Sequence, residues 1–139
     1  MGFRDGQGSE MTRAYVEHVA VRVRDIHWHI RFFREVLGMT AREYDGPPGD
    51  PRQYWAVGGI QLLAAPDFTG REGPLAHIGV MCDYLDAALG AAEAFGVEAL
   101  PKGRNWLRLR DGLELELLQA SGGSVGLVLA IDHRHGTEA

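Results

Sequence analysis

Three short stretches of the chain alternate between apolar and polar residues, as half-buried β-strands do. Residues 15–23 place His18 on one face and valines on the other. Residues 75–82 alternate in the same way, with His77 on the more polar face. Residues 113–117 alternate leucine with glutamate. If these three strands converge, two imidazoles and a carboxylate meet at one point.

An apolar helical stripe follows each of the first two strands. Asp25 is a suitable N-cap for the first helix, and Gly38 is placed to end it. The apolar residues of this helix are Ile26, Ile30, Phe33 and Leu37. The second helix is expected to begin at Asp83 or Asp86 and to end at Gly96. Its apolar residues are Leu85, Leu89, Ala92 and Phe95.

The middle of the chain predicts three more strands, at residues 39–44, 52–57 and 60–64. The last two are separated by a pair of glycines, which suits a two-residue hairpin loop with positive φ at both positions. The pairs that this register places on one face are Ala56 with Gln61 and Tyr54 with Leu63. The opposite face is the more apolar of the two.

A final hairpin is expected around Asp111 and Gly112, and it has two alternative registers. A two-residue turn would put Arg108 among the leucines. A three-residue loop with Gly112 in the left-handed region instead gives one face made of leucine. We favour the second register, because apolar parity sets strand pairing when one face is buried. The other face then holds Trp106, Arg108, Glu114 and Glu116.

The chain therefore reads as two copies of strand–helix–strand–strand–strand, at about 14–66 and 75–120. Residues 1–13 are polar and glycine-rich, and we expect a flexible start. Residues 121–139 form a tail, in which 125–131 are apolar and strand-like. This stretch is predicted to be either an extra strand or part of a subunit contact.

The composition of the chain excludes several classes of binding partner and location. The 139 residues suffice for one domain, and a net charge of −5 argues against nucleic acid. No apolar run approaches the roughly 18–20 residues of a membrane helix. The start of the chain lacks the apolar segment of a signal peptide. The single cysteine, Cys82, excludes an internal disulfide and fits a reducing cytoplasm. We expect a cytoplasmic protein that acts on a small molecule.

Several motifs, taken in order, resemble the vicinal oxygen chelate superfamily, also called the glyoxalase/bleomycin-resistance/extradiol-dioxygenase superfamily. They lie at residues 17–21, Asp25, 32–38, 75–80 and 111–117. The resemblance covers residues 15 to about 120. It implies an α+β fold of two βαβββ modules, whose curled mixed sheets hold a divalent metal on a concave face. It also implies a homodimer.

Carried over residue by residue, the resemblance implies that the metal ligands are His18, Gln61, His77 and Glu116. Two histidines and a carboxylate suit one divalent ion per site, either Ni, Mn, Fe, Co or Zn. Such a metal would chelate two adjacent substrate oxygens and act as a Lewis acid. Gln61 is either a fourth ligand, as in the glyoxalase I and methylmalonyl-CoA epimerase branch, or polar lining. Without it the set resembles that of extradiol dioxygenases.

The resemblance also implies a carboxylate that moves a carbon-bound proton, and Glu116 or Glu114 is in place for that role. The side chains expected to line the substrate site are Arg22, Tyr54, Trp106 and Arg108. They favour an anionic substrate with an apolar portion. The prediction is a metal-dependent lyase or isomerase of glyoxalase type. The alternatives are an Fe(II) dioxygenase and a metal-free drug-binding resistance protein.

Overall fold

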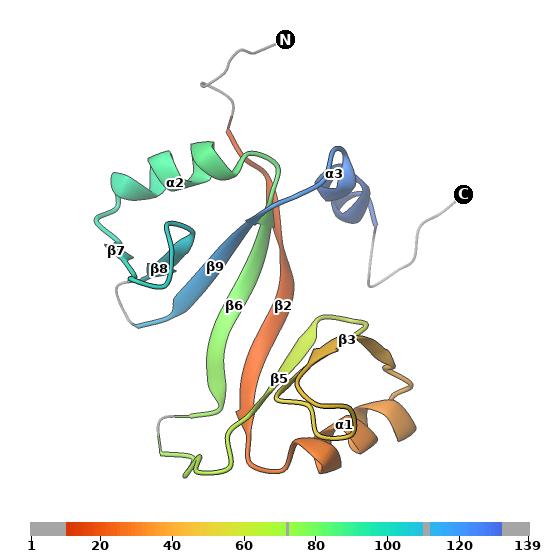
Figure 1. The fold of residues 1–139 in the computed structure, drawn as a ribbon. Helices are drawn as coiled ribbons and strands as arrows, with labels where there is room; N and C mark the ends of the chain where they lie inside the picture. The colour runs from red at the N-terminus through yellow and green to blue at the C-terminus, as the bar shows by residue number, and fades with distance from the viewer. Residues whose placement is uncertain (1–10, 72, 110–111, 132–139) are drawn as a thin grey trace. The chain divides into compact units, whose positions relative to one another are not determined.

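The computed structural model describes residues 11–71, 73–109 and 112–131 (Figure 1). Most of the predicted flexible start and the end of the tail lie outside the described residues. The chain divides into two compact units. The first unit is His18–Ile78, and the second combines Met1–Glu17 with Gly79–Ala139. Two strands, β2 (Ala14–Val23) and β6 (Leu75–Cys82), contribute residues to both units.

The first unit holds one helix and a sheet. Its elements after β2 are α1 (Ile26–Glu35), β3 (Ala41–Asp45), β4 (Gln53–Ala56) and β5 (Ile60–Ala64). The strand order is β3-β4-β5-β2, and β6 lies next to β2. β5 runs parallel to β2, whereas β3, β4 and β5 pair in antiparallel fashion. All three predicted middle strands are therefore present: β5 has the predicted bounds, whereas those of β3 and β4 differ by one or two residues.

One face of this sheet packs against α1, and we call it the helix face. Its buried cluster consists of Val23, Ile26, Ile30, Tyr54, Ala56 and Leu62. The side chain of Asp25 caps α1 by accepting a hydrogen bond from the backbone of Trp28 at 3.1 Å, as predicted. Gly38 follows the helix with φ 70°. The helix ends at Glu35, so Leu37 lies beyond the apolar stripe and is 55% exposed.

The predicted register of the β4–β5 hairpin is wrong by one residue. Ala56 pairs with Ile60 and Trp55 pairs with Gln61, so that the loop has three residues. The shift places Tyr54, Ala56, Ile60 and Leu62 together on the helix face. Tyr54 is 6% exposed and packs in the cluster that includes Ile26 and Ile30 of α1, and the burial of its ring favours the observed register.

The second unit also combines a helix with strands. Its elements are the end of β6, α2 (Leu85–Glu93), β7 (Glu98–Ala99), β8 (Trp106–Arg108), β9 (Glu114–Gln119) and α3 (Ser124–Leu129). The strand order is β6-β9-β8-β7. Cys82, Leu107 and Leu117 form the buried cluster, against which α2 packs through Leu85, Ala88, Leu89 and Ala92.

The predicted register of the β8–β9 hairpin is confirmed. Leu107 pairs with Leu115, and the backbone of Leu109 donates to the carbonyl of Leu113. Gly112 has φ 100°, which is the left-handed conformation that the three-residue loop requires. The loop residues Arg110 and Asp111 lie outside the described residues.

The ends of α2 differ from the prediction. Its N-cap is Tyr84, which makes no side-chain capping bond, whereas Asp83 or Asp86 was expected to begin the helix. The backbone N–H of Leu85 instead donates to Oε1 of Gln119 on β9 at 2.8 Å. The helix ends at Glu93, and Phe95, expected on its apolar stripe, is 78% exposed.

The apolar stretch at 125–131 is mainly helical, so the prediction of an extra strand is wrong. α3 buries Val125 completely and leaves Leu127 73% exposed. An extra strand would need a neighbour, but β9 already lies between β6 and β8. A helix satisfies its own backbone hydrogen bonds and needs no such neighbour. Among the described residues, no helix is long and apolar enough to cross a membrane.

Candidate metal centre

Two buried histidines face each other within the first unit. His18 on β2 is 4% exposed and His77 on β6 is 8% exposed. Their Nε2 atoms are 3.3 Å apart, and the two rings are nearly perpendicular, at 85°. The structure therefore brings together the two histidines that the repeat singled out.

The spacing of the two nitrogens fits a shared divalent metal. Imidazole ligands lie about 2.0–2.1 Å from Zn²⁺, and similar lengths hold for the other first-row ions considered. Two such bonds at angles of about 90–110° place the nitrogens about 2.8–3.4 Å apart. The observed 3.3 Å between Nε2 atoms lies within this range. Both imidazoles therefore fit one ion without a change of strand position.

Gln61 on β5 supplies a carbonyl oxygen on the same face of the sheet. It pairs with Ala20 in the parallel β2–β5 ladder, so its side chain shares the face that carries His18. We call this the histidine face. The amide nitrogen of Gln61 donates to Oε1 of Gln53 at 2.7 Å. Its own Oε1 is buried and has no hydrogen-bond partner among the described residues.

An unsatisfied buried carbonyl costs about 1–3 kcal/mol, which makes this atom unusual in a folded protein. The cost disappears when the oxygen coordinates a cation. Gln53, which the sequence pattern did not single out, orients the amide so that its oxygen and not its nitrogen is left over. The chemistry of Gln61 therefore fits a weak neutral metal ligand.

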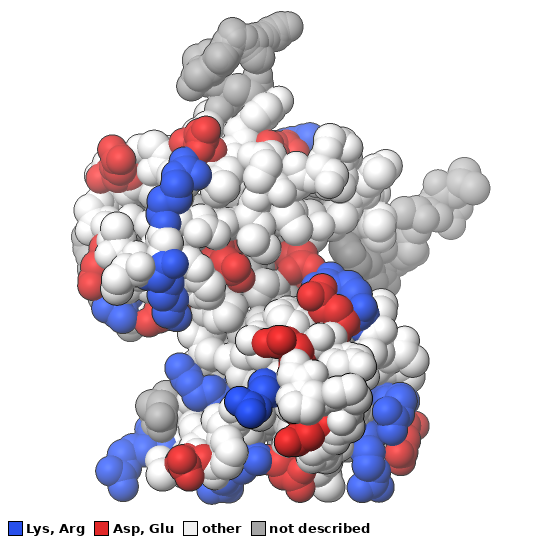
Figure 2. Space-filling view, viewed as in Figure 1, with Lys and Arg blue, Asp and Glu red and all other residues white. Residues whose placement is uncertain are grey.

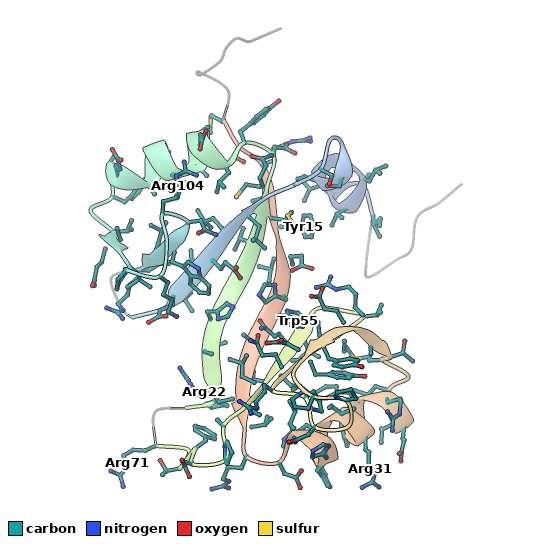
Figure 3. The ribbon with its side chains drawn as sticks, viewed as in Figure 1. Tyr15, Arg22, Arg31, Trp55, Arg71 and Arg104 are labelled. Atoms are coloured by element: carbon teal, nitrogen blue, oxygen red, sulfur yellow. The ribbon has the colours of Figure 1, made fainter. Side chains whose placement is uncertain are left out.

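The corrected β4–β5 register changes which aromatic residue lies on the histidine face. Tyr54, predicted to line the substrate site, belongs to the buried cluster on the helix face. Trp55 pairs with Gln61 and is half-buried on the histidine face (Figure 3). The alternation of β4 alone does not tell which of its faces carries the polar groups. Trp55 could therefore be assigned to the histidine face only from the register of the β4–β5 pairing.

Arg22 is also held in the first unit, but by backbone groups. Its guanidinium donates to the carbonyl of Leu75 at 3.0 Å and to that of Gly73 at 3.4 Å (Figure 3). Its backbone N–H donates to the carbonyl of Pro74. Arg22 therefore fixes the start of β6, the strand that carries His77.

In the second unit, Glu116 lies opposite Trp106 in the β8–β9 ladder, and both are half-buried. The next pair on the same face is Arg108 with Glu114. The four residues expected on one face of this hairpin are thus there. Glu116 is not a member of the unit that holds the histidines, and its role as their third ligand stays a prediction.

Glu114 is held by two cations. Arg108 donates to one of its carboxylate oxygens at 3.0 Å and Lys102 to the other at 3.1 Å. Arg108 and then Lys102 lower the pKa of Glu114 below its ordinary value. Basic and acidic side chains also adjoin one another at several places on the face in Figure 2. A carboxylate with a lowered pKa is a weaker proton acceptor, which disfavours Glu114 as a general base.

Trp106 and Arg108 have close neighbours of their own. The ammonium of Lys102 lies 4.4 Å from the centre of the Trp106 ring. Arg108 donates to Glu98 as well as to Glu114. Lys102 was missing from the predicted site, because its position in a loop gave no periodic signal.

The family model of the Glyoxalase/Bleomycin resistance protein/Dioxygenase superfamily matches residues 15–106. The chain belongs to this superfamily, whose members commonly bind a divalent metal. No curated protein matched the sequence at a significant level.

Solved structures show the same fold. Methylmalonyl-CoA epimerase from Mycobacterium tuberculosis is 20% identical, with a TM-score of 0.56 over 83% of this chain and 91% of its own. A variant of the Streptomyces coelicolor epimerase, in complex with 2-nitronate-propionyl-CoA, is 18% identical, with a TM-score of 0.56 over 81% of this chain and 97% of its own. The 2,3-dioxygenase LapB from Pseudomonas sp. KL28 is 17% identical, with a TM-score of 0.58 over 76% of this chain and 42% of its own. The fold is therefore α+β and glyoxalase-like, as predicted.

Proposed function

We propose that this protein is a divalent-metal-dependent lyase or isomerase of glyoxalase type. The observation that carries the proposal is the buried pair of His18 and His77, whose Nε2 atoms lie at a spacing that fits one ion. The unsatisfied Oε1 of Gln61 on the histidine face supports it independently. A buried carbonyl oxygen without a partner among the described residues is costly in a protein that binds nothing there.

In this proposal, His18, Gln61 and His77 hold the metal, and Glu116 completes the set. When bound, the metal supplies Lewis acidity toward two adjacent oxygens of the substrate. The proton is moved by a carboxylate, and Glu116 is the better of the two predicted candidates. Glu114 is occupied by Arg108 and Lys102, which lower its pKa and with it its affinity for a proton.

Gln61 is also the reason for placing lyase or isomerase chemistry before oxygenase chemistry. Fe(II) oxygenases use two histidines and one carboxylate and keep the remaining positions open for oxygen and substrate. A fourth protein ligand closes one of those positions. A metal-free binding protein would gain nothing from burying two histidines and one unsatisfied amide oxygen side by side on neighbouring strands.

The proposed substrate is a small, anionic, oxygenated compound. Trp106 and Arg108 remain candidates to contact it from the second unit. In the first unit, Trp55 takes the place of Tyr54, and the substrate contact predicted for Arg22 stays part of the proposal. We retain the homodimer as a further part, and the mass of the protein in solution tests it separately.

Metal binding is the first test. Protein stripped with a chelator is reloaded separately with Ni²⁺, Mn²⁺, Co²⁺, Zn²⁺ and anaerobic Fe²⁺, and bound metal is measured by elemental analysis. We expect about one ion per chain, lost in His77→Ala and retained in His27→Ala. His27 is a matched control, because it is an exposed histidine paired with Asp50 on the surface. Absence of metal in the wild-type protein under every condition would overturn the proposal.

The reaction class is tested next. A panel of small α-hydroxycarbonyl and malonyl compounds is incubated with loaded protein in D₂O, and exchange at carbon is followed by NMR. We expect exchange with at least one compound and its loss in Glu116→Gln, with much smaller loss in Glu114→Gln. Oxygen uptake with catechols, without any such exchange, would favour the dioxygenase instead.

A further inference from the structure

A cavity lies in the first unit, at the place where β2 ends and α1 begins. Its volume is about 550 Å³, which is within the size range of small-molecule sites. Its walls come from the end of β2, the start of α1, β5 and the segment that leads to β6. The aromatic residues among them are Trp28, Phe33 and Phe68.

This cavity is separate from the metal centre. It is lined by Val21, Val23 and Leu62, whose side chains belong to the apolar cluster on the helix face. His18 and Gln61 lie on the histidine face of the same two strands. A ligand in the cavity would therefore occupy the opposite side of the sheet from the proposed metal.

The charged residues around the cavity are mainly basic. Arg22 and Arg24 both line it. Arg24 donates to the carbonyl of Phe68 at 3.3 Å, and Arg22 donates to the carbonyls of the segment before β6. In the part of the chain that the structure describes, neither guanidinium pairs with a carboxylate. Each arginine has five N–H donors, so donors remain for an anion.

The one carboxylate among the described lining residues is already in use. Asp25 lines the cavity, and its side chain accepts from the backbone N–H of Trp28 at the start of α1. This bond caps the helix and orients the carboxylate toward the backbone. Asp25 is thus directed toward the start of α1, and no carboxylate of the described residues pairs with Arg24.

The apolar lining adds a place for the body of a ligand. Trp28 is 52% exposed, although an indole is among the largest apolar side chains. It stacks on Phe32 at 14° between the ring planes, with 5.4 Å between centroids, which holds its orientation. A fixed, half-exposed indole beside two further aromatic rings is a surface on which a planar ligand gains contact area.

We propose that this cavity binds a small organic anion, with its carboxylate at Arg24 and its aromatic or aliphatic body against Trp28, Phe33 and Phe68. The proposal does not depend on the metal centre. It rests on Arg24, which has no carboxylate partner among the described residues, and on the aromatic lining of a cavity that the sheet separates from His18.

The test uses 2-naphthoate and its neutral analogue 2-naphthamide, titrated by calorimetry into full-length protein kept free of metal by a chelator. We expect 2-naphthoate to bind saturably and more tightly than the amide. Arg24→Gln should weaken 2-naphthoate binding by about tenfold, the loss of one charge-assisted hydrogen bond, and leave 2-naphthamide unchanged. Arg31→Gln is the matched control, because Arg31 lies on α1, pairs with Glu35 and does not line the cavity.

The variant His77→Ala tests whether the cavity is independent of the metal centre. We expect 2-naphthoate binding to persist in that variant. Circular dichroism establishes that each variant is folded. Absence of 2-naphthoate binding would overturn the proposal, as would equal binding of the acid and the amide. Binding that is lost in His77→Ala but retained in Arg24→Gln would place the carboxylate at the histidines and overturn it as well.

Discussion

The two units use the same kinds of elements but stabilise their helices differently. In the first unit, α1 carries its own N-cap, Asp25, and buries Ile26 and Ile30. In the second unit, α2 has no side-chain cap of its own and no fully buried residue. Its first N–H is satisfied by Gln119 from β9. Similar topology can therefore be held by a local signal in one unit and by a tertiary contact in the other.

The units also differ in how their strands carry polar groups. The histidine face of the first unit holds two imidazoles and an amide oxygen that are buried. The corresponding polar face of the β8–β9 hairpin holds Arg108 and Glu114, which neutralise each other with Lys102. The first set includes one oxygen, Oε1 of Gln61, that has no hydrogen-bond partner among the described residues, whereas the charges of the second set are paired within the protein. This contrast supports the proposal that the first set binds a metal.

The largest expected effect comes from the core of the first unit. Leu62 is completely buried between the sheet and α1, so Leu62→Ala should lower the free energy of unfolding by about 2–5 kcal/mol. Leu127→Ala is the control, since this leucine of α3 is 73% exposed and should change stability by less than about 0.5 kcal/mol. Urea unfolding of both variants measures the difference. Equal effects would contradict the assignment of the core.

The start of each helix gives the next largest effect. Asp25→Ala should cost about 1 kcal/mol, the usual value for an N-cap. Gln119→Ala should cost as much or more, because Gln119 accepts from Leu85 and also donates to the carbonyl of Asp83 at 2.5 Å. Asp86→Ala, at one of the two residues expected from the sequence to begin the second helix, should cost less. A larger loss for Asp86→Ala than for Gln119→Ala would restore the sequence-based assignment.

Substitution of Gln61 tests whether this residue serves metal binding or the stability of the fold. In metal-free protein, Gln61→Leu removes a buried unsatisfied oxygen but also the hydrogen bond to Gln53, so the two effects oppose each other and stability should change by less than about 1 kcal/mol. The same variant should bind metal more weakly. Thermal unfolding with and without metal measures both effects. Marked destabilisation of the metal-free variant would show that the amide has a structural role instead.

The smallest effect is the pH dependence that Glu114 contributes. Its pKa is lower in the folded protein than in the unfolded chain, because Arg108 and Lys102 favour the charged form. Its contribution to stability is therefore complete above the unfolded-state pKa and is lost as the pH falls through the folded-state pKa. Glu114→Gln should flatten the acid limb of the stability profile. The control variant Glu93→Gln, on α2, should leave that limb unchanged.

Several features were predictable because they depend on neighbours along the chain. Asp25 and Gly38 mark the limits of the first helix region from local capping chemistry alone. The leucines of β8 and β9 define one face whichever partner they meet, so the register of that hairpin follows from parity. The alternation of β2 likewise separates His18 from the valines. In each case only one arrangement buries the apolar residues.

Other features depended on packing between distant segments. Both faces of β4 carry an aromatic residue, so its register was decided by the fit of Tyr54 under α1. The stretch 125–131 is apolar enough for a strand, but no strand position beside β9 remained. The unsatisfied oxygen of Gln61 depends on Gln53, which no motif marks.

The sequence by itself determined which residues were available for a metal and on which face of its strand His18 would lie. The tertiary structure decided that His18 and His77 meet at 3.3 Å, because this distance depends on how β2 and β6 lie beside each other. Alternation along one strand specifies the direction of a side chain but not the strand that it will face. That choice belongs to the burial of apolar surface across the whole unit, which no local pattern contains.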